Sequence, residues 1–123
     1  MRKEKEILWR ENKYEVMAHS QNAYRHIQKE INAISLNELA NLIKEAKEIT
    51  STKGSVINTY QHIWGYFKKK ASQLEKEKTF ELLRKYEEEQ IKEMLLWQWL
   101  AKLAEKYEET YLLQSTLIVK HLH

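Results

Sequence analysis

The sequence predicts an all-α protein, folded as a single compact bundle of five or six helices. The chain of 123 residues contains no proline, only two glycines and no aspartate, so that all 18 acidic residues are glutamate. Proline, glycine and aspartate favour turns, whereas glutamate, lysine, leucine and alanine favour helix interiors. Apolar residues also recur at helical spacing through most of the chain. Two capping boxes, Ser35 with Glu38 and Ser72 with Glu75, mark helix starts.

Three helices are predicted before the first loop. Residues 3–18 place apolar side chains on one broad face, which predicts the first helix. Ser20 can cap a second helix that runs to about Ala33. The capping box at Ser35 opens the third helix, whose apolar stripe extends to Ala46. Each of these helices therefore has one face to bury against its neighbours.

A fourth helix is predicted from about Ser55 to Lys70. It follows the most loop-like segment, residues 50–55, where serine and threonine compete with helical hydrogen bonds and glycine frees the backbone. At about 100° per residue its apolar side chains gather on a core-facing side. They are Ile57, Tyr60, Ile63, Trp64 and Phe67. A polar row lies nearly opposite and consists of Asn58, His62, Tyr66 and Lys69. Gly65 would cost a helix interior about 1 kcal/mol, which indicates that another helix or a ligand approaches the backbone there.

The C-terminal half leaves three alternatives open. The polar run Glu87–Glu89 contains neither glycine nor proline, so that residues 73–107 form either one kinked helix or two. The segment Ile91–Tyr107 is the most apolar helix and carries large side chains around more than half its circumference. Such a helix lies at the centre of a bundle or in a subunit interface. The tail Tyr111–His123 is a short helix or an extended arm.

Composition excludes several classes of protein. The length predicts one domain, residues 1–123. Without cysteine, this chain alone cannot hold a disulfide, a thiolate zinc site, a cysteine nucleophile or an iron–sulfur cluster. No segment is apolar over the roughly 20 residues of a membrane span, and the first residues lack a signal-peptide pattern, so we expect a cytoplasmic protein. The five histidines show no metal-binding spacing, and we predict neither metal nor cofactor.

The net charge of +3 is unevenly spread. Residues 1–70 carry 13 Lys and Arg against 8 Glu, a net of +5, and residues 71–123 carry 8 against 10, a net of −2. A dedicated nucleic-acid-binding module concentrates more positive charge than this. Tyr66 and Phe67, together with Lys68–Lys70 and Lys53, could still stack on a nucleotide or RNA and contact its phosphates. Alternatively, the lysine triplet only complements the dipole at a helix C-terminus.

Two segments carry a family resemblance. Asn58–Lys69, NTYQHIWGYFKK, resembles the N-V-L-x-H-x-x-G-Y-F-K-K segment of the bacterial YbgA-like family. Lys13–Ser20, KYEVMAHS, is similar to the K-x-x-x-M-A-H-S segment of that family, and Tyr111–Gln114 is loosely similar to its ending. Two histidines that are usual in the family are replaced here by Val56 and Trp9. The resemblance covers essentially the whole chain and implies a helical domain of uncharacterised activity.

The resemblance also implies a biochemical context. In other proteins the YbgA-like domain is fused to a cysteine-ligated iron–sulfur domain like that of thiouracil desulfidases. The resemblance therefore implies an accessory role in the metabolism of modified or thiolated pyrimidines, with an iron–sulfur enzyme as partner. Because this chain has no cysteine, the catalytic part of that chemistry must lie outside it.

Residues and resemblance together predict a small helical accessory or binding domain that recognises a nucleotide or a modified nucleobase. In this hypothesis Asn58 forms hydrogen bonds with a polar edge of the ligand, and His62 exchanges a proton or a hydrogen bond with it. Tyr66 stacks on the ligand or donates a hydrogen bond to it. Lysine side chains hold an anion. The candidate contacts are Lys13, His19, Asn58, His62, Tyr66 and Lys69. Whether His62 and Tyr66 also catalyse a proton transfer is left open.

The alternative hypothesis is a purely structural module without a ligand site. Such a module would pair with an enzyme partner or with a second copy of itself through the Ile91–Tyr107 helix.

Overall fold

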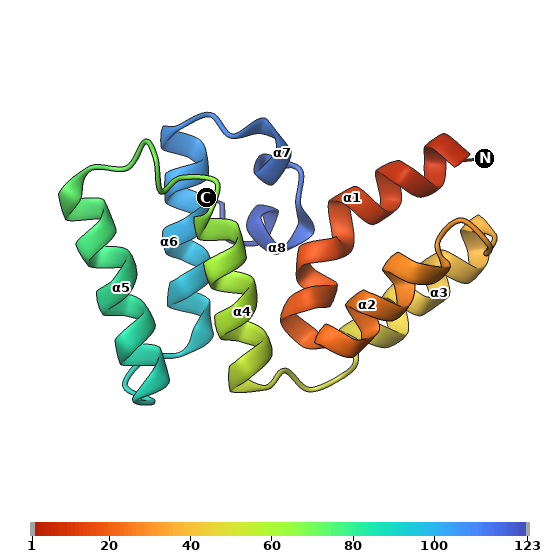
Figure 1. Ribbon diagram of the computed structural model, residues 1–123, viewed down its shortest axis with the longest axis horizontal. Helices are drawn as coiled ribbons and strands as arrows, with labels where there is room; N and C mark the ends of the chain where they lie inside the picture. The colour runs from red at the N-terminus through yellow and green to blue at the C-terminus, as the bar shows by residue number, and fades with distance from the viewer. Residues whose placement is uncertain (1, 123) are drawn as a thin grey trace.

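Eight α-helices form the computed structural model, which describes residues 2–122 and contains no strand within that range (Figure 1). The helices are α1 (Arg2–His19), α2 (Gln21–Glu30), α3 (Leu36–Lys47), α4 (Lys53–Trp64), α5 (Gln73–Glu87), α6 (Glu93–Lys106), α7 (Thr110–Leu113) and α8 (Thr116–Val119). The all-α prediction is confirmed, but the predicted number of five or six helices is wrong. The difference lies in the tail, where α7 and α8 are single turns of four residues each. The tail is therefore neither one short helix nor an extended arm.

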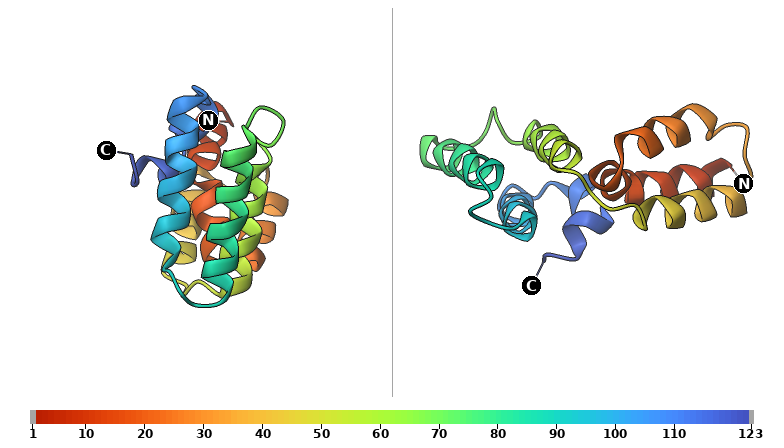
Figure 2. Two further views of the ribbon diagram at one scale, coloured as in Figure 1. Left: turned by 90° about the vertical axis from the view of Figure 1, so that its left-hand side faces the viewer. Right: turned by 90° about the horizontal axis from the view of Figure 1, so that it is seen from below.

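The six longer helices form two groups of three. Figure 1 shows α1, α2 and α3 on one side and α4, α5 and α6 on the other, with α7 and α8 between them. Seen from below, the two groups lie side by side (Figure 2). α1 packs against α2, α3, α4 and α8, whereas α6 packs against α4, α5, α7 and α8. The other helices are thus arranged about α1 and α6.

Side-chain caps begin the helices where the sequence predicts them. The hydroxyl of Ser20 accepts a hydrogen bond from the backbone N–H of Ala23 at 3.0 Å and caps α2. The predicted capping boxes at Ser35 and Ser72 both form and begin α3 and α5. Each cap satisfies backbone donors that a helix start leaves unpaired, and is typically worth about 1 kcal/mol.

The predicted bounds of the fourth helix are wrong at both ends. α4 spans Lys53–Trp64, whereas Ser55–Lys70 was predicted. It begins earlier because Thr52 and Ser55 form a capping box of their own. Each of these two side-chain oxygens accepts the backbone N–H of the other residue at 3.0 Å. The segment that looked like a loop therefore contributes the first residues of the helix.

The chain leaves the α-helical pattern at Gly65, which is the C-cap of α4. The backbone N–H groups of Tyr66 and Phe67 bond to the carbonyls of Ile63 and Trp64 at 3.0 and 2.9 Å, three residues back instead of four. Such tighter turns are frequent at helix ends. They place Phe67 in the core, while Tyr66 reaches α1.

Gly65 also has a different neighbour from the one predicted. A Cβ atom added at Gly65 would lie 3.0 Å from the carbonyl oxygen of His62. Among the described residues, the close approach is therefore to the preceding turn of the same chain, and not to another helix.

Residues 73–107 form two helices, not one that is kinked. α5 ends at Glu87 and α6 begins at Glu93. Between them Glu89 adopts a left-handed backbone with φ of 60°, and the N–H of Gln90 bonds to the carbonyl of Lys85 at 2.8 Å. Non-glycine residues adopt this conformation only rarely. No glycine marks the helix end, and the sequence therefore could not decide the question.

Two clusters of buried apolar residues hold the helices together. The smaller lies between α1, α2 and α3 and consists of Trp9, Val16, Ile27, Leu39, Ile43 and Ala46. The larger joins the second half of α1 to α4, α6 and α8. The predicted core face is confirmed for Tyr60, Ile63 and Trp64 of α4 and for Phe67 in the turn after it, which are at most 6% exposed, whereas Ile57 is only partly buried. Most of the apolar surface of α6 is buried in the same cluster, and this helix is central to the bundle.

Candidate ligand-binding site

Five side chains, four of them aromatic, converge where α1, α4 and α7 meet. This aromatic cluster consists of Lys13 and Tyr14 from α1, His62 from α4, Tyr66 from the turn after α4, and Tyr111 from α7. Lys13, His62 and Tyr66 are three of the six candidates predicted from the sequence. The fold therefore brings half of the predicted site together.

Tyr66 lies at the centre of the aromatic cluster. Its hydroxyl oxygen is 2.6 Å from that of Tyr14, so the two share a hydrogen bond, and their rings meet edge-on with centroids 6.2 Å apart. The ring of Tyr66 stacks on Tyr111 at 6.1 Å, and the ring of Tyr14 lies 5.8 Å from the imidazole of His62. Stacked and edge-on pairs at such distances are favourable arrangements of aromatic rings. The turn after α4 thus positions Tyr66 between α1 and α7.

The aromatic cluster extends from the core to the solvent. Tyr14 is buried, Tyr66 and Tyr111 are half-buried, and His62 is exposed. Burial, and next to it the hydrogen bond with Tyr66, raises the pKa of Tyr14 far above its ordinary value. The Lys13 Nζ atom lies 5.3 Å from the ring centroids of both Tyr14 and Tyr111. Tyr14 therefore keeps its proton at neutral pH, and the cluster offers hydroxyl groups, ring faces and one ammonium.

The hydrogen bond between the two hydroxyl groups predicts energetic coupling. In a double-mutant cycle, Tyr14→Phe and Tyr66→Phe are expected to show a coupling free energy of about 1 kcal/mol, because either substitution alone removes the whole hydrogen bond. Urea unfolding of the wild type, the two single variants and the double variant measures it. A cycle that pairs Tyr66→Phe with Tyr86→Phe is the control and should show no coupling free energy. Additive effects of Tyr14→Phe and Tyr66→Phe would contradict the shared hydrogen bond.

The other three candidates lie outside the aromatic cluster. The Nδ1 atom of His19 is 2.8 Å from the carbonyl oxygen of Ile49, which holds the imidazole against the loop after α3. The side-chain amide of Asn58 donates to Gln21 at 2.8 Å. Lys69 is exposed in the turn after α4. Within residues 2–122, no hydrogen bond, ion pair or ring contact links these three to the cluster.

The lysines considered for phosphate contacts are partly engaged within the protein. Lys70 pairs with the carboxylate of Glu109 at 3.3 Å. Lys53 pairs with Glu89 at 3.5 Å. Phe67 is fully buried, so its ring is not available for stacking on a base. This face of the molecule is therefore a weaker candidate for a nucleotide than the aromatic cluster.

Two members of the aromatic cluster, Tyr14 and Tyr111, were not among the predicted site residues. Tyr14 was assigned to the apolar face of the first helix, which is correct for its ring. The family motif K-x-x-x-M-A-H-S leaves the position after Lys13 unspecified, so no sequence signal identified the Tyr14 hydroxyl as part of a site. Tyr111 lies in the tail, whose conformation the sequence left open, and no local pattern indicates that it meets Tyr66.

A buried carboxylate next to Tyr14 was also not predicted. The side chain of Glu15 is 4% exposed; Lys120 Nζ donates to it at 2.5 Å, and Lys47 Nζ lies 3.6 Å away. Lys47 also donates to the side-chain oxygen of Asn12. Burial acts to raise the pKa of Glu15, but the hydrogen bond from Lys120 and the charge of Lys47 outweigh it and hold the pKa below its ordinary value. This charged network joins α1 to the ends of α3 and α8.

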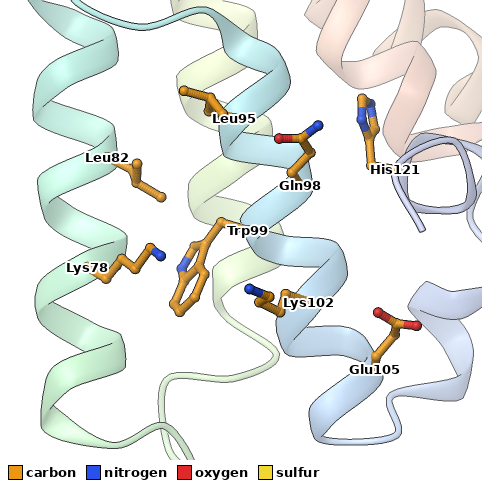
Figure 3. Close-up of a pocket in the computed structure, with 8 residues that line it drawn as sticks. All are labelled: Lys78, Leu82, Leu95, Gln98, Trp99, Lys102, Glu105 and His121. Carbon is orange, nitrogen blue, oxygen red and sulfur yellow. The ribbon is translucent and has the colours of Figure 1, made fainter. Parts of the chain in front are cut away.

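A groove of about 470 Å³ lies away from the aromatic cluster, along α5 and α6 (Figure 3). Lys78 points from α5 toward Trp99 of α6, and its Nζ atom lies 4.6 Å from the centre of the indole ring. The indole N–H of Trp99 donates to the hydroxyl of Thr79 at 2.8 Å. None of the six predicted site residues lines this groove.

Two further observations concern metals and membranes. Among residues 2–122, no three histidine or glutamate side chains are grouped in a way that could hold a metal ion. No helix in the same range combines the length and the apolar composition needed to cross a membrane.

Fold and site together define an all-α domain of two helix groups, with an aromatic cluster where they meet. The chain belongs to a family described as "Protein of unknown function (DUF1722)", whose family model matches residues 13–121. The matched segment contains all six predicted site residues and every member of the aromatic cluster. No curated protein and no solved structure was found to match the chain.

Proposed function

We propose that this chain is a YbgA-like accessory domain that binds a nucleotide or a modified nucleobase at the aromatic cluster. The observation that carries the proposal is the position of Tyr66, stacked on Tyr111 and hydrogen-bonded to Tyr14 beside a lysine and a histidine. Nucleobases are planar and stack on aromatic side chains, with about 1–3 kcal/mol gained per base. Resemblance to domains fused to thiouracil-desulfidase-like enzymes favours a pyrimidine as the base.

Each member of the aromatic cluster has a role in this proposal. Tyr14 is buried and holds the Tyr66 hydroxyl in place, which reduces the entropy lost when a ligand binds. His62 is exposed and can donate or accept a hydrogen bond at a base edge. Lys13 supplies a positive charge next to Tyr111, where an anionic group of the ligand can approach.

The proposal is tested by titrating the protein with uridine and 2-thiouridine in a calorimeter. His62→Ala is expected to weaken binding about tenfold, because it removes one hydrogen-bonding and stacking partner. His26→Ala is the matched control, since His26 is an exposed histidine on α2 and should leave the affinity unchanged. If neither nucleoside binds the wild type, or if both histidine variants bind equally, the aromatic cluster is not the site.

A second candidate function is supported by the outer face of α6. We propose, as the alternative, that this face pairs the domain with a second copy of itself or with an iron–sulfur enzyme partner. Met94 and Leu95 are 50% and 41% exposed, and Leu95 borders the groove of Figure 3. Trp97 is only 3% exposed, so its substitution would disturb the core and would not report on an interface.

This alternative predicts an effect of charge on assembly. Leu95→Glu should abolish any dimer seen by light scattering, because a charge would be buried in the contact. Leu74→Glu, on α5, is the control, since Leu74 is 78% exposed. The alternative is wrong if the wild-type protein is monomeric at high concentration and also does not bind to an immobilised desulfidase-type domain.

A further inference from the structure

A second groove runs along α1 and joins the aromatic cluster. It has a volume of about 350 Å³, and Lys13 and Tyr111 border it as well as belonging to the cluster. Lys5, Glu6 and Arg10 line its length on α1. A ligand that stacks on the aromatic cluster would therefore meet this groove directly.

The groove is electropositive. Its charged lining consists of three cations, Lys5, Arg10 and Lys13, against one carboxylate, Glu6, for a formal charge of +2. The ammonium of Lys5 is held by the carbonyl oxygens of Ile31 and Ile34 at 2.8 and 2.7 Å, so its position is fixed. Charges that are already fixed in place bind an anion at a lower entropic cost.

Arg10 gives the most specific indication of a ligand. Its Nε atom is buried, and it has no hydrogen-bond partner among the described residues. A buried donor without a partner costs about 1–3 kcal/mol, and more when the group is charged. A guanidinium binds phosphate or carboxylate through two parallel N–H bonds, and Nε is one of the five donors of its fork. Arg10 also lines the groove, so an anionic oxygen bound there would meet its guanidinium.

We propose that this groove binds the phosphate groups of a mononucleotide, with the base on the aromatic cluster. The inference rests on the proposed function and extends it, because it names the class of ligand and adds Arg10 and Lys5 as contacts. The volume falls within the range of about 300–1,000 Å³ that is usual for small-molecule sites. In this proposal the guanidinium of Arg10 contacts the phosphate oxygens, and Lys13 lies between phosphate and base. The carboxylate of Glu6 repels the anion.

The experiment uses inorganic pyrophosphate and uridine diphosphate as separate probes, titrated calorimetrically at low and at physiological salt. Arg10→Gln and Arg10→Lys are both expected to weaken pyrophosphate binding about tenfold, because lysine keeps the charge but not the planar fork. Glu6→Gln should strengthen binding about threefold by removing a like charge. Lys44→Gln, which removes an exposed charge on α3, should change nothing. Thermal unfolding confirms that each variant is folded.

The outcomes separate the inference from the proposed function. Pyrophosphate binding that depends on Arg10, without any binding of uridine, would support the groove and refute the base site. Uridine binding without pyrophosphate binding would support the base site and refute the groove. If Arg10→Gln and Lys44→Gln weaken pyrophosphate binding equally, the proposed phosphate site is wrong, because only the overall positive charge of the protein would then attract the anion. An RNA oligomer that binds far more tightly than uridine diphosphate, and independently of Arg10, would overturn it as well.

Discussion

Replacing Phe67 with alanine is expected to lower the free energy of unfolding by about 3–5 kcal/mol. Phe67 is fully buried at the point where the chain turns after α4, and its ring lies 6.1 Å from that of Tyr107. The substitution loses the transfer free energy of the ring and leaves a cavity that the surrounding helices fill only in part. Urea unfolding followed by circular dichroism measures the loss.

Phe80→Ala is the matched control for this prediction. Phe80 is 56% exposed on α5 and contacts the ring of Trp64 at 6.2 Å. Its removal is expected to cost less than about 1 kcal/mol, because little apolar surface returns to water. Equal losses for the two variants would show that the turn after α4 does not place Phe67 in the core. Tyr66 would then lack the support that positions it against Tyr14.

Glu15→Gln is expected to destabilise the protein by about 2–3 kcal/mol. The substitution keeps the shape of the side chain but removes the charge that Lys47 and Lys120 approach. Breaking a buried ion pair usually costs about 3–5 kcal/mol. We expect less here because the two lysine side chains are 29% and 58% exposed and can be rehydrated. Urea unfolding at neutral pH measures the change.

The same residue predicts how stability depends on pH. The pKa of Glu15 is lower in the folded protein than its ordinary value of 4.5, so the unfolded state binds the proton more readily. The contribution of Glu15 is therefore complete above about pH 4.5 and is lost as the pH falls through the folded pKa. The stability difference between wild type and Glu15→Gln should shrink in acid. Glu45→Gln, at an exposed position of α3, should show no such trend. A difference that does not change with pH would mean that the pKa of Glu15 is the same in the folded and the unfolded protein.

The helices themselves could be predicted because they depend on local chemistry. The caps at Ser20, Ser35 and Ser72 follow from hydrogen bonds within a few residues, and the core face of α4 follows from a period of 3.6. Helix ends were predicted less well. The end of α5 depends on the left-handed conformation of Glu89, which its residue type does not favour.

The candidate site could be predicted only in part, because its members come from distant segments. Lys13, His62 and Tyr66 stand in two recognisable motifs, and the fold does place them together. Tyr111 reaches them only because the tail folds into α7. Arg10 was not predicted at all, since what distinguishes it is a buried nitrogen without a partner, which depends on the complete packing of the groove.

The hydrogen bond between Glu15 and Lys120 joins residues 105 positions apart in the chain. A ribosome that adds about 5–20 residues per second would synthesise Lys120 about 5–20 s after Glu15. During that interval the carboxylate of Glu15 can pair with Lys47 of α3 but not with Lys120, so its charged network is incomplete. The two apolar clusters can therefore not acquire their final packing at the same time. The smaller one, formed by α1, α2 and α3, can assemble on the emerging chain, whereas the larger one must wait for α6 and α8.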